Sequence, residues 1–245
     1  MIRVAAVGDV HVGRDSAGML RPHWANLAER ADLLLLAGDL TRHGEPEEAA
    51  VVADELRDVG VPVITVLGNH DYQSDQERAV RHVLEDAGVT VLEGEATVVG
   101  VDGTRVGVAG AKGFGGGFVG ACASDFGEPE MKAFVRHTKA VADRLHRALV
   151  ALEADVRIAL LHFSPVQDTL EGERLEIYPF LGSYLLGEAI DLAGADLALH
   201  GHAHAGSEKG VTPGGVQVRN VAQPVIGHAY NLYCLGGETP PACEP

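Results

Sequence analysis

Residues 33–39 read Leu-Leu-Leu-Leu-Ala-Gly-Asp, a short apolar run that ends in a carboxylate. A continuous apolar run of this length, bounded by a turn signal, predicts a strand that is buried on both faces. Four further apolar runs also end at side chains that can bind metals: 2–7 before Asp9 and His11, 61–67 before Asn69, 156–161 before His162, and 196–199 before His202 and His204. Because ligands bind at the carboxyl ends of the strands in an α/β sheet, we expect these five strand ends to share one site.

The rest of the pattern predicts an α/β fold with mixed sheets. Helices are predicted over 22–31, 45–59, 74–87 and 131–152. Ser74 is the predicted N-cap of the third helix, with Glu77 completing a capping box. Gly60 and Gly88 stand where two of the helices should end. Strands that alternate with helices favour parallel pairing.

Antiparallel strands are also expected. Short strands are predicted over 89–92, 96–101 and 105–109, and Asp102-Gly103 between the last two is a hairpin signal. Residues 112–120 are glycine-rich, and we expect an irregular loop there. The second half then predicts a strand, a loop over 163–182, a helix, a strand and a closing β region over 216–235.

Length, composition and cysteine content restrict the class of protein. The 245 residues contain no low-complexity linker, so we expect one domain over 1–236 and a disordered Pro-rich tail over 237–245. No apolar run is long enough to cross a bilayer, and no secretory signal is visible, so no membrane partner is expected. The three cysteines, Cys122, Cys234 and Cys243, are odd in number and lack ligand spacing. This favours a reduced, cytoplasmic location.

The net charge of −16 at pH 7 argues against long nucleic acid as a partner, because such a surface repels polyanions. A small phosphate ester is not excluded, since bound divalent cations would reverse the local potential. The oligomeric state is left open, with a homodimer as one alternative.

Taken singly, most of these motifs can be explained by a purely structural role. Asp9-Val10-His11 and Gly38-Asp39 could reflect turn chemistry, and His162 could be a core histidine. Gly201-His202-Ala203-His204 is the most specific, because two imidazoles two residues apart after a strand seldom serve a purely structural need. The joint occurrence at five strand ends favours a metal site, and carboxylate, imidazole and carboxamide suit divalent first-row metals.

This pattern, from Asp9 to His204, resembles the calcineurin-like metallophosphoesterase superfamily. The resemblance implies a four-layer α/β/β/α sandwich and two divalent ions, whether Mn, Fe or Zn. It also implies seven protein ligands: Asp9, His11 and His204 on the first ion, Asn69, His162 and His202 on the second, and Asp39 bridging both. A dinuclear centre of this kind hydrolyses a phosphate ester by attack of a metal-bridging hydroxide.

Two residues are candidates for catalysis without binding metal. His70, next to Asn69, can face the scissile phosphate and protonate or stabilise the leaving oxygen. Asp71 is predicted to orient His70, with a structural role in the turn as the alternative.

Departures from the superfamily pattern indicate which branch of the superfamily the chain resembles most. Its protein Ser/Thr phosphatases carry an Asp at the position of Arg42 and lack the doubled histidine. Gly38–Thr41 and Gly44–Pro46 are more similar to the bacterial branch that includes class III cyclic-nucleotide phosphodiesterases. A small phosphodiester is therefore the favoured substrate. The alternatives are a phosphomonoesterase of a small metabolite and a non-catalytic, metal-bearing scaffold, and the intact His70 and ligand set argue against the scaffold.

A few other residues stand out but carry less weight. Lys112 with Gly113–Gly117 resembles a phosphate cradle, but it lacks the Gly-Lys-Ser/Thr ending of a P-loop, so we expect a flexible loop over the site. His200 is predicted to be a strand residue beside the site. Three further histidines, His23, His43 and His228, could line its mouth, and Tyr178–Phe180 could shape a substrate pocket or belong to the core.

Overall fold

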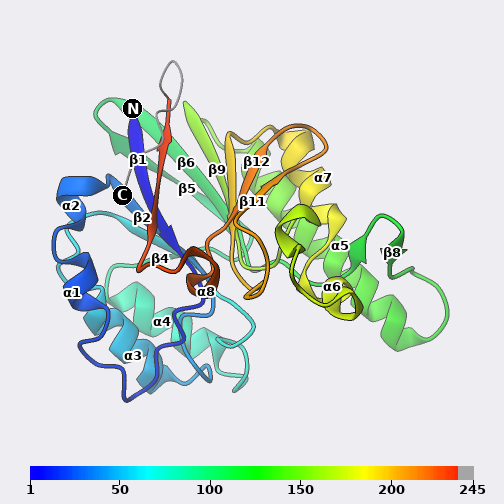
Figure 1. The fold of residues 1–245 in the computed structure, drawn as a ribbon, viewed down its shortest axis with the longest axis horizontal. Coiled ribbons are helices and arrows are strands. Elements are labelled where there is room, and N and C mark those ends of the chain that lie inside the picture. The colour runs from blue at the N-terminus through cyan, green and yellow to red at the C-terminus, as the bar shows by residue number, and fades with distance from the viewer. Residues whose placement is uncertain (237–245) are drawn as a thin grey trace.

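The protein is a sandwich of two β-sheets with helices on both outer faces, as Figure 1 shows. The structure is a computed structural model that describes residues 1–236. The predicted disordered tail at 237–245, including Cys243, lies outside the described residues, and the single domain over 1–236 stays a prediction. The predicted four-layer α/β/β/α arrangement is confirmed.

The first sheet has five strands in the order β13-β1-β2-β3-β4. Their bounds are Asn231–Leu235, Ile2–Val7, Leu33–Ala37, Val63–Val66 and Thr90–Val91. Neighbours from β1 to β4 pair in parallel, and β13 is antiparallel to β1 with Ile2 opposite Leu235. Parallel pairing brings the carboxyl ends of β1, β2 and β3 to one edge.

The second sheet has six strands in the order β11-β12-β10-β9-β6-β5. Their bounds are Lys209–Val211, Gln217–Asn220, Leu197–His200, Val156–Leu161, Thr104–Ala111 and Glu95–Val101. The four central strands are parallel, and both edge strands are antiparallel to their neighbours. The predicted hairpin joins β5 to β6, with Asp102 and Gly103 both at positive φ, as a two-residue turn of this kind requires.

Three apolar clusters hold the layers together. The cluster between the sheets includes Val4 and Leu35 from the first sheet and Val108, Ile158 and Leu160 from the second, all almost fully buried. Helices α1 (Arg21–Trp24), α2 (Leu27–Arg30), α3 (Pro46–Glu55) and α4 (Glu77–Asp86) pack on the first sheet. Helices α5 (Pro129–Val150) and α7 (Tyr184–Ala193) cover the second. The one-turn helices α6 (Tyr178–Leu181) and α8 (Gln223–Ile226) lie in connections.

Several boundaries differ from the prediction. The helix expected over 22–31 is two single turns, α1 and α2. The capping box is wrong: α4 starts after Gln76 with no side-chain cap, and the Ser74 hydroxyl donates to the Gly44 carbonyl instead. A serine hydroxyl can satisfy a distant carbonyl as well as a helix end. The predicted stop at Gly88 is confirmed, because Gly88 and Val89 donate to Glu85 and Leu84 in a Schellman pattern.

The glycine-rich segment 112–120 is more regular than expected. Its last residues form β7 (Gly117–Phe118), which pairs antiparallel with β8 (Ala121–Cys122). In contrast, α3 ends at Glu55, five residues before the stop predicted at Gly60.

Within residues 1–236, no helix has the length and apolar character needed to span a membrane.

The inter-sheet core predicts a sharp difference between two identical substitutions. Leu160→Ala should lower the free energy of unfolding by about 2–5 kcal/mol, because Leu160 is fully buried between the sheets and its loss leaves a cavity. The matched control Leu192→Ala removes a leucine that is 78% exposed, and should change it by about 0.5 kcal/mol or less. Urea denaturation measures both, and equal effects would contradict the assigned core.

Candidate metal centre

The candidate ligands meet where the carboxyl ends of the two sheets come together. Asp9, Asp39 and Asn69 follow β1, β2 and β3 of the first sheet, while His162 and His202 follow β9 and β10 of the second. Backbone bonds join the sheets at this edge, as Gly8 donates to Val221 and Gln223 donates to Gly8. The site therefore straddles the sandwich.

The ligand atoms of the expected set form two groups, and Asp39 belongs to the second and also faces the first. One group contains Asp9, His11 and His204, and the other contains Asp39, His162 and His202, with the atoms of each group within 4.8 Å of one another. The Asp39 Oδ2 atom lies 3.9 Å from His11 Nε2, and its Oδ1 atom lies 3.4 Å from His162 Nε2. The two oxygens of Asp39 therefore face the two groups, as a bridging carboxylate would.

Asn69 completes the second group through His162. The Nδ1 atom of His162 donates to the Ala37 carbonyl at 2.8 Å, and in this tautomer the lone pair of the ring lies on Nε2. That Nε2 faces Asn69 Oδ1 at 2.9 Å and Asp39 Oδ1 at 3.4 Å. Lone pairs that converge without a proton between them suit a cation, and the Ala37 carbonyl fixes the ring as an outer partner of a metal ligand does.

An unsatisfied nitrogen supports the same conclusion for the first group. The Nε2 atom of His11 is buried and has no hydrogen-bond partner among the described residues. Burial lowers the pKa of His11, so its ring is neutral at pH 7 and Nε2 can offer a lone pair. A buried polar atom without a partner is rare and costly, and a bound metal would satisfy it. The residues present therefore fit divalent ions.

The turns that present the ligands are strained. Asp9, His11, Asp39 and His202 all have left-handed backbone, with φ of 59°, 44°, 51° and 69°. Side chains other than glycine seldom adopt this conformation, and such strain concentrates at functional sites. Four candidate ligands in this region indicate that the turns are shaped to aim side chains.

Two glycines of the motifs allow the ligand loops to touch. A Cβ on Gly68 would overlap the carboxylate and backbone nitrogen of Asp39, and a Cβ on Gly201 would overlap the carboxylate of Asp9. Each glycine therefore lets one strand end approach the acidic ligand of another. This explains on physical grounds why glycine precedes Asn69 and His202 in the sequence.

The protonation of the histidines follows their surroundings. Burial lowers the pKa of His202 to about 3, so this ring is neutral and able to bind a metal. The hydrogen bond with Asp9, at 2.8 Å from Nε2, raises the pKa of His204. The backbone N–H of His202 also donates to both oxygens of Asp9. Asp9 is thus oriented by the loop that also carries its partner His204.

His70 borders the centre with one nitrogen directed elsewhere. Its Nδ1 atom donates to the Arg42 carbonyl at 2.8 Å, and its ring lies edge-on to His11 with centroids 4.5 Å apart. The backbone N–H of His70 donates to Asp39 Oδ1 at 2.8 Å. The Nε2 atom is left to act on the site, and it also falls within a possible ligand group with His11 and Asp39.

The contacts of Asp71 differ from the expectation that it orients His70. Its carboxylate is fully buried and accepts bonds from the backbone of Gly68, Leu40 and Thr41 and from the Thr41 hydroxyl. It therefore ties the loop after β2 to the loop after β3. The Arg42 carbonyl orients the His70 ring instead. These contacts fit the alternative role of Asp71 in the turn.

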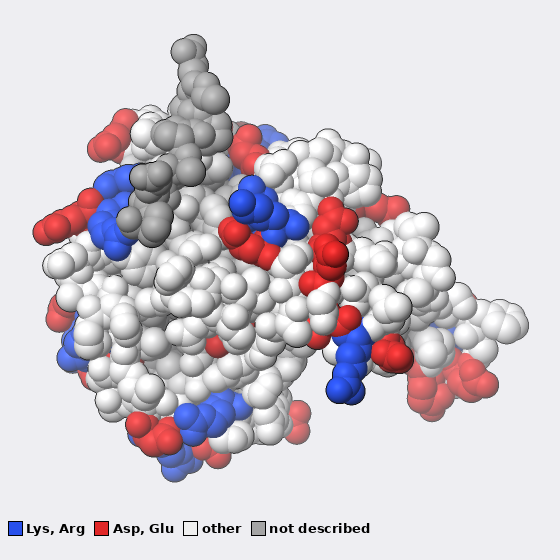
Figure 2. Space-filling model, in the orientation of Figure 1, with Lys and Arg blue, Asp and Glu red and all other residues white. Residues whose placement is uncertain are grey.

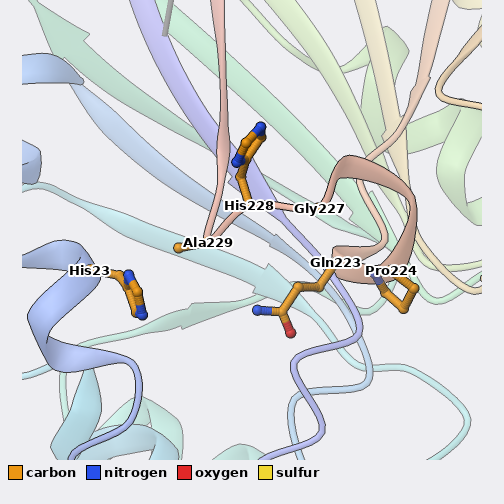
Figure 3. Close-up of a pocket in the computed structure, with 6 residues that line it drawn as sticks. All are labelled: His23, Gln223, Pro224, Gly227, His228 and Ala229. Atoms are coloured by element: carbon orange, nitrogen blue, oxygen red, sulfur yellow. The ribbon is translucent and has the colours of Figure 1, made fainter.

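The remaining candidates are distributed as follows. His200 is a buried residue of β10 whose Nε2 contacts the Thr169 hydroxyl at 2.8 Å, so it is a satisfied core histidine. His43 pairs with Glu48. Figure 3 shows His23 and His228 on a separate pocket of about 540 Å³, whose lining includes none of the seven candidate ligands. Phe180 is largely exposed, and its carbonyl lies 3.4 Å from His202 Nε2.

Two residues that bond to the loops around the centre, Thr41 and Glu93, were not among the candidates from the sequence. Thr41 bonds Asp71 and Gly44, and Glu93 bonds the Tyr72 hydroxyl. Glu93 follows the short strand β4 in a chain rich in glutamate, so no motif distinguishes it. Thr41 lies two residues after Asp39, and its position in that loop was the one available hint.

The fold and the ligand pattern together point to one family of proteins. Residues 2–206 match the family of calcineurin-like phosphoesterases, and the chain belongs to this family. A probable cyclic nucleotide phosphodiesterase of a Synechococcus strain is 36% identical over 80 residues, which cover 29% of this chain and 31% of that protein. The match thus spans less than a third of the relative's length.

Solved structures share the fold at low sequence identity. A phosphopantetheinyl hydrolase from Mycobacterium tuberculosis superposes with a TM-score of 0.66 and 15% identity, covering 97% of this chain and 98% of that one. GAP50, the anchor in the inner membrane complex of Plasmodium, gives 0.53 and 16%, covering 91% and 72%. These similarities support the fold alone.

The close approach at Gly68 generates a test of the ligand geometry. Gly68→Ala should lower metal content and activity by at least about tenfold, because its Cβ must displace the Asp39 carboxylate. The control Gly100→Ala places a methyl group in open space on β5 and should leave both unchanged. Metal analysis of the purified variants measures the effect. Full metal content in Gly68→Ala would contradict the position assigned to Asp39.

Proposed function

We propose that the protein hydrolyses a small phosphate ester, preferably a diester, at a centre of two divalent metal ions. The observation that carries this proposal is the position of Asp39, whose two oxygens face separate groups of histidines and carboxylates. Asp9, His11 and His204 would hold one ion. Asn69, His162 and His202 would hold the other, with Asp39 shared.

Two bound ions would supply a nucleophile at neutral pH and neutralise the phosphoryl oxygens. The residues of the chain have three further tasks. Ala37 holds the tautomer of His162, and the two oxygens of Asp9 are held by the His202 backbone. Asp71 keeps the loops after β2 and β3 together, so that Asp39 and Asn69 stay in register.

His70 is the proposed proton donor to the leaving oxygen. Its Nδ1 atom is fixed on the Arg42 carbonyl, so a proton on the ring's other nitrogen points toward the substrate side. General acid catalysis requires a group placed within hydrogen-bond reach of the leaving atom. The edge contact with His11 limits rotation of the ring.

The preference for a diester is supported by two observations. The curated relative is named as a phosphodiesterase, and the position at which protein phosphatases of the superfamily carry an Asp is Arg42 here. The guanidinium of Arg42 pairs with Asp15 at 3.0 Å, and His70 contacts only the backbone carbonyl of Arg42. A phosphomonoesterase is the alternative within enzymes. A non-catalytic scaffold is disfavoured, because it would have no need for four candidate ligands with strained backbone.

A panel of esters with separate metals tests the proposal. Metal-free protein should be reloaded with Mn²⁺, Zn²⁺, Fe²⁺ or Mg²⁺ and assayed with bis-p-nitrophenyl phosphate and p-nitrophenyl phosphate. Faster turnover of the diester, with two ions bound per chain, is the expected result. Preference for the monoester would establish the alternative enzyme, and absence of turnover with every metal would favour a scaffold.

A second prediction concerns His70. His70→Ala should retain its metals and lose roughly 10²–10⁴-fold in turnover, because an acid group is removed without removing a ligand. The loss should shrink for esters with good leaving groups, which need less protonation. The exposed His82 on α4 provides the control His82→Ala. Loss of metal from His70→Ala would show that His70 is a ligand.

The surface charge generates a third prediction. On the face shown in Figure 2, Lys and Arg side chains lie in small groups beside acidic ones rather than in one basic surface. With 19 Lys and Arg against 35 Asp and Glu, duplex DNA should bind more weakly than about 1 µM at physiological salt. Gel-shift titration is the measurement. Sub-micromolar binding would make a nuclease the leading hypothesis.

A further inference from the structure

Lys112 places an ammonium group among three aromatic rings beside the candidate metal centre. It follows the last residue of β6, and its Nζ atom lies 4.6 Å from the ring centroid of Tyr72 and 5.4 Å from those of Phe114 and Phe163. The rings come from three separate segments. Cation–π contacts of this kind stabilise a cation that has lost part of its hydration.

The ammonium lacks an acceptor. Among residues 1–236, no hydrogen bond or ion pair engages the Nζ atom of Lys112, although an ammonium carries three donors. Burial lowers the pKa of Lys112, and the negative charges of Glu93 and Asp39 oppose that effect. Lys112 is half-buried, so its unused donors remain available to an anionic group of a ligand.

Glu93 leaves a second polar atom unsatisfied in the same place. Its Oε2 atom accepts from the Tyr72 hydroxyl at 3.0 Å, whereas its Oε1 atom is buried without a partner among the described residues. Burial raises the pKa of Glu93, and the charge of Lys112 opposes that rise. The two groups affect each other, yet they form no direct ion pair. Because Oε1 is an acceptor, a donor such as water and not an anion would satisfy it.

The cluster of Lys112 and its three rings borders the group of ligands around His162. The Lys112 carbonyl accepts from the backbone N–H groups of His162 and Phe163 at 3.0 and 2.9 Å. The Phe163 ring lies 4.3 Å from the ring of His202. On the opposite wall, Tyr72 comes two residues after His70. A substrate at the metal centre could therefore extend toward Lys112.

We propose that Lys112 binds a second anionic group of the substrate, at a distance from the scissile phosphate. This inference rests on the proposed function and refines its substrate class to esters whose organic part carries a carboxylate or another phosphate. The three rings supply an apolar wall for the atoms between the two anionic groups.

The test uses two ligands that differ only in the second charge. Propylphosphonate and 3-phosphonopropionate both present a phosphonate to the metals, but only the latter adds a carboxylate. Calorimetry on the metal-loaded protein should find 3-phosphonopropionate bound roughly tenfold more tightly, as expected for a charge-assisted hydrogen bond. Lys112→Met should abolish this preference and leave the affinity for propylphosphonate unchanged. Lys112→Arg should retain part of it.

The control Lys139→Met removes the same charge from an exposed lysine that pairs with Asp125, and should keep the full preference. A preference that persists in Lys112→Met would overturn the proposal. So would a lower melting temperature together with weaker binding of both ligands.

The outcomes separate this inference from the catalytic proposal. Turnover of phosphate esters without a preference for 3-phosphonopropionate would leave the enzyme intact and refute the role of Lys112. A preference that depends on Lys112, in a protein that hydrolyses no ester with any metal, would establish the role of Lys112 and refute the catalytic proposal.

Discussion

The geometry of the site depends on the contact between the Asp39 turn and Gly68. Asp39 adopts left-handed backbone at the end of β2, and its carboxylate lies where a Cβ on Gly68 would be. This proximity places one oxygen of Asp39 toward His11 and the other toward His162. The Asp71 carboxylate links the same two loops by accepting four hydrogen bonds. The strain in the turn is tolerable because the surrounding core is almost fully buried.

The sequence was sufficient to predict the strands that carry the ligands. β1, β2 and β9 begin and end where their apolar runs do, because strands buried on both faces need continuous apolar residues. The convergence of Asp9, Asp39, Asn69, His162, His202 and His204 then follows from parallel pairing. Turn and cap chemistry was less predictable. The Ser74 hydroxyl donates to the carbonyl of Gly44, 30 residues earlier, instead of capping a helix. The end of the glycine-rich segment forms β7, which pairs with β8.

Contacts between distant segments account for what the sequence could not predict. Asp71 accepts bonds from backbone N–H groups of two loops. The sequence pattern does not distinguish it from any other acidic residue in a turn. Of the aromatic rings around Lys112, Tyr72 lies 40 residues before it in the sequence and Phe163 lies 51 residues after it. Only Phe114 is nearby in the sequence, so no local pattern joins the three rings. Burial and pairing of this kind depend on tertiary packing.

Because the candidate ligands come from both sheets, bound ions would act as cross-links across the sandwich. The first group joins Asp9 of the first sheet to His204 of the second, and the other joins Asp39 to His162. Ions that bind only the folded state stabilise it by mass action, by about 2.7 kcal/mol for each site at a hundredfold excess over the dissociation constant. The resistance of this fold to heat and proteolysis would thus vary with the metal supply of its surroundings.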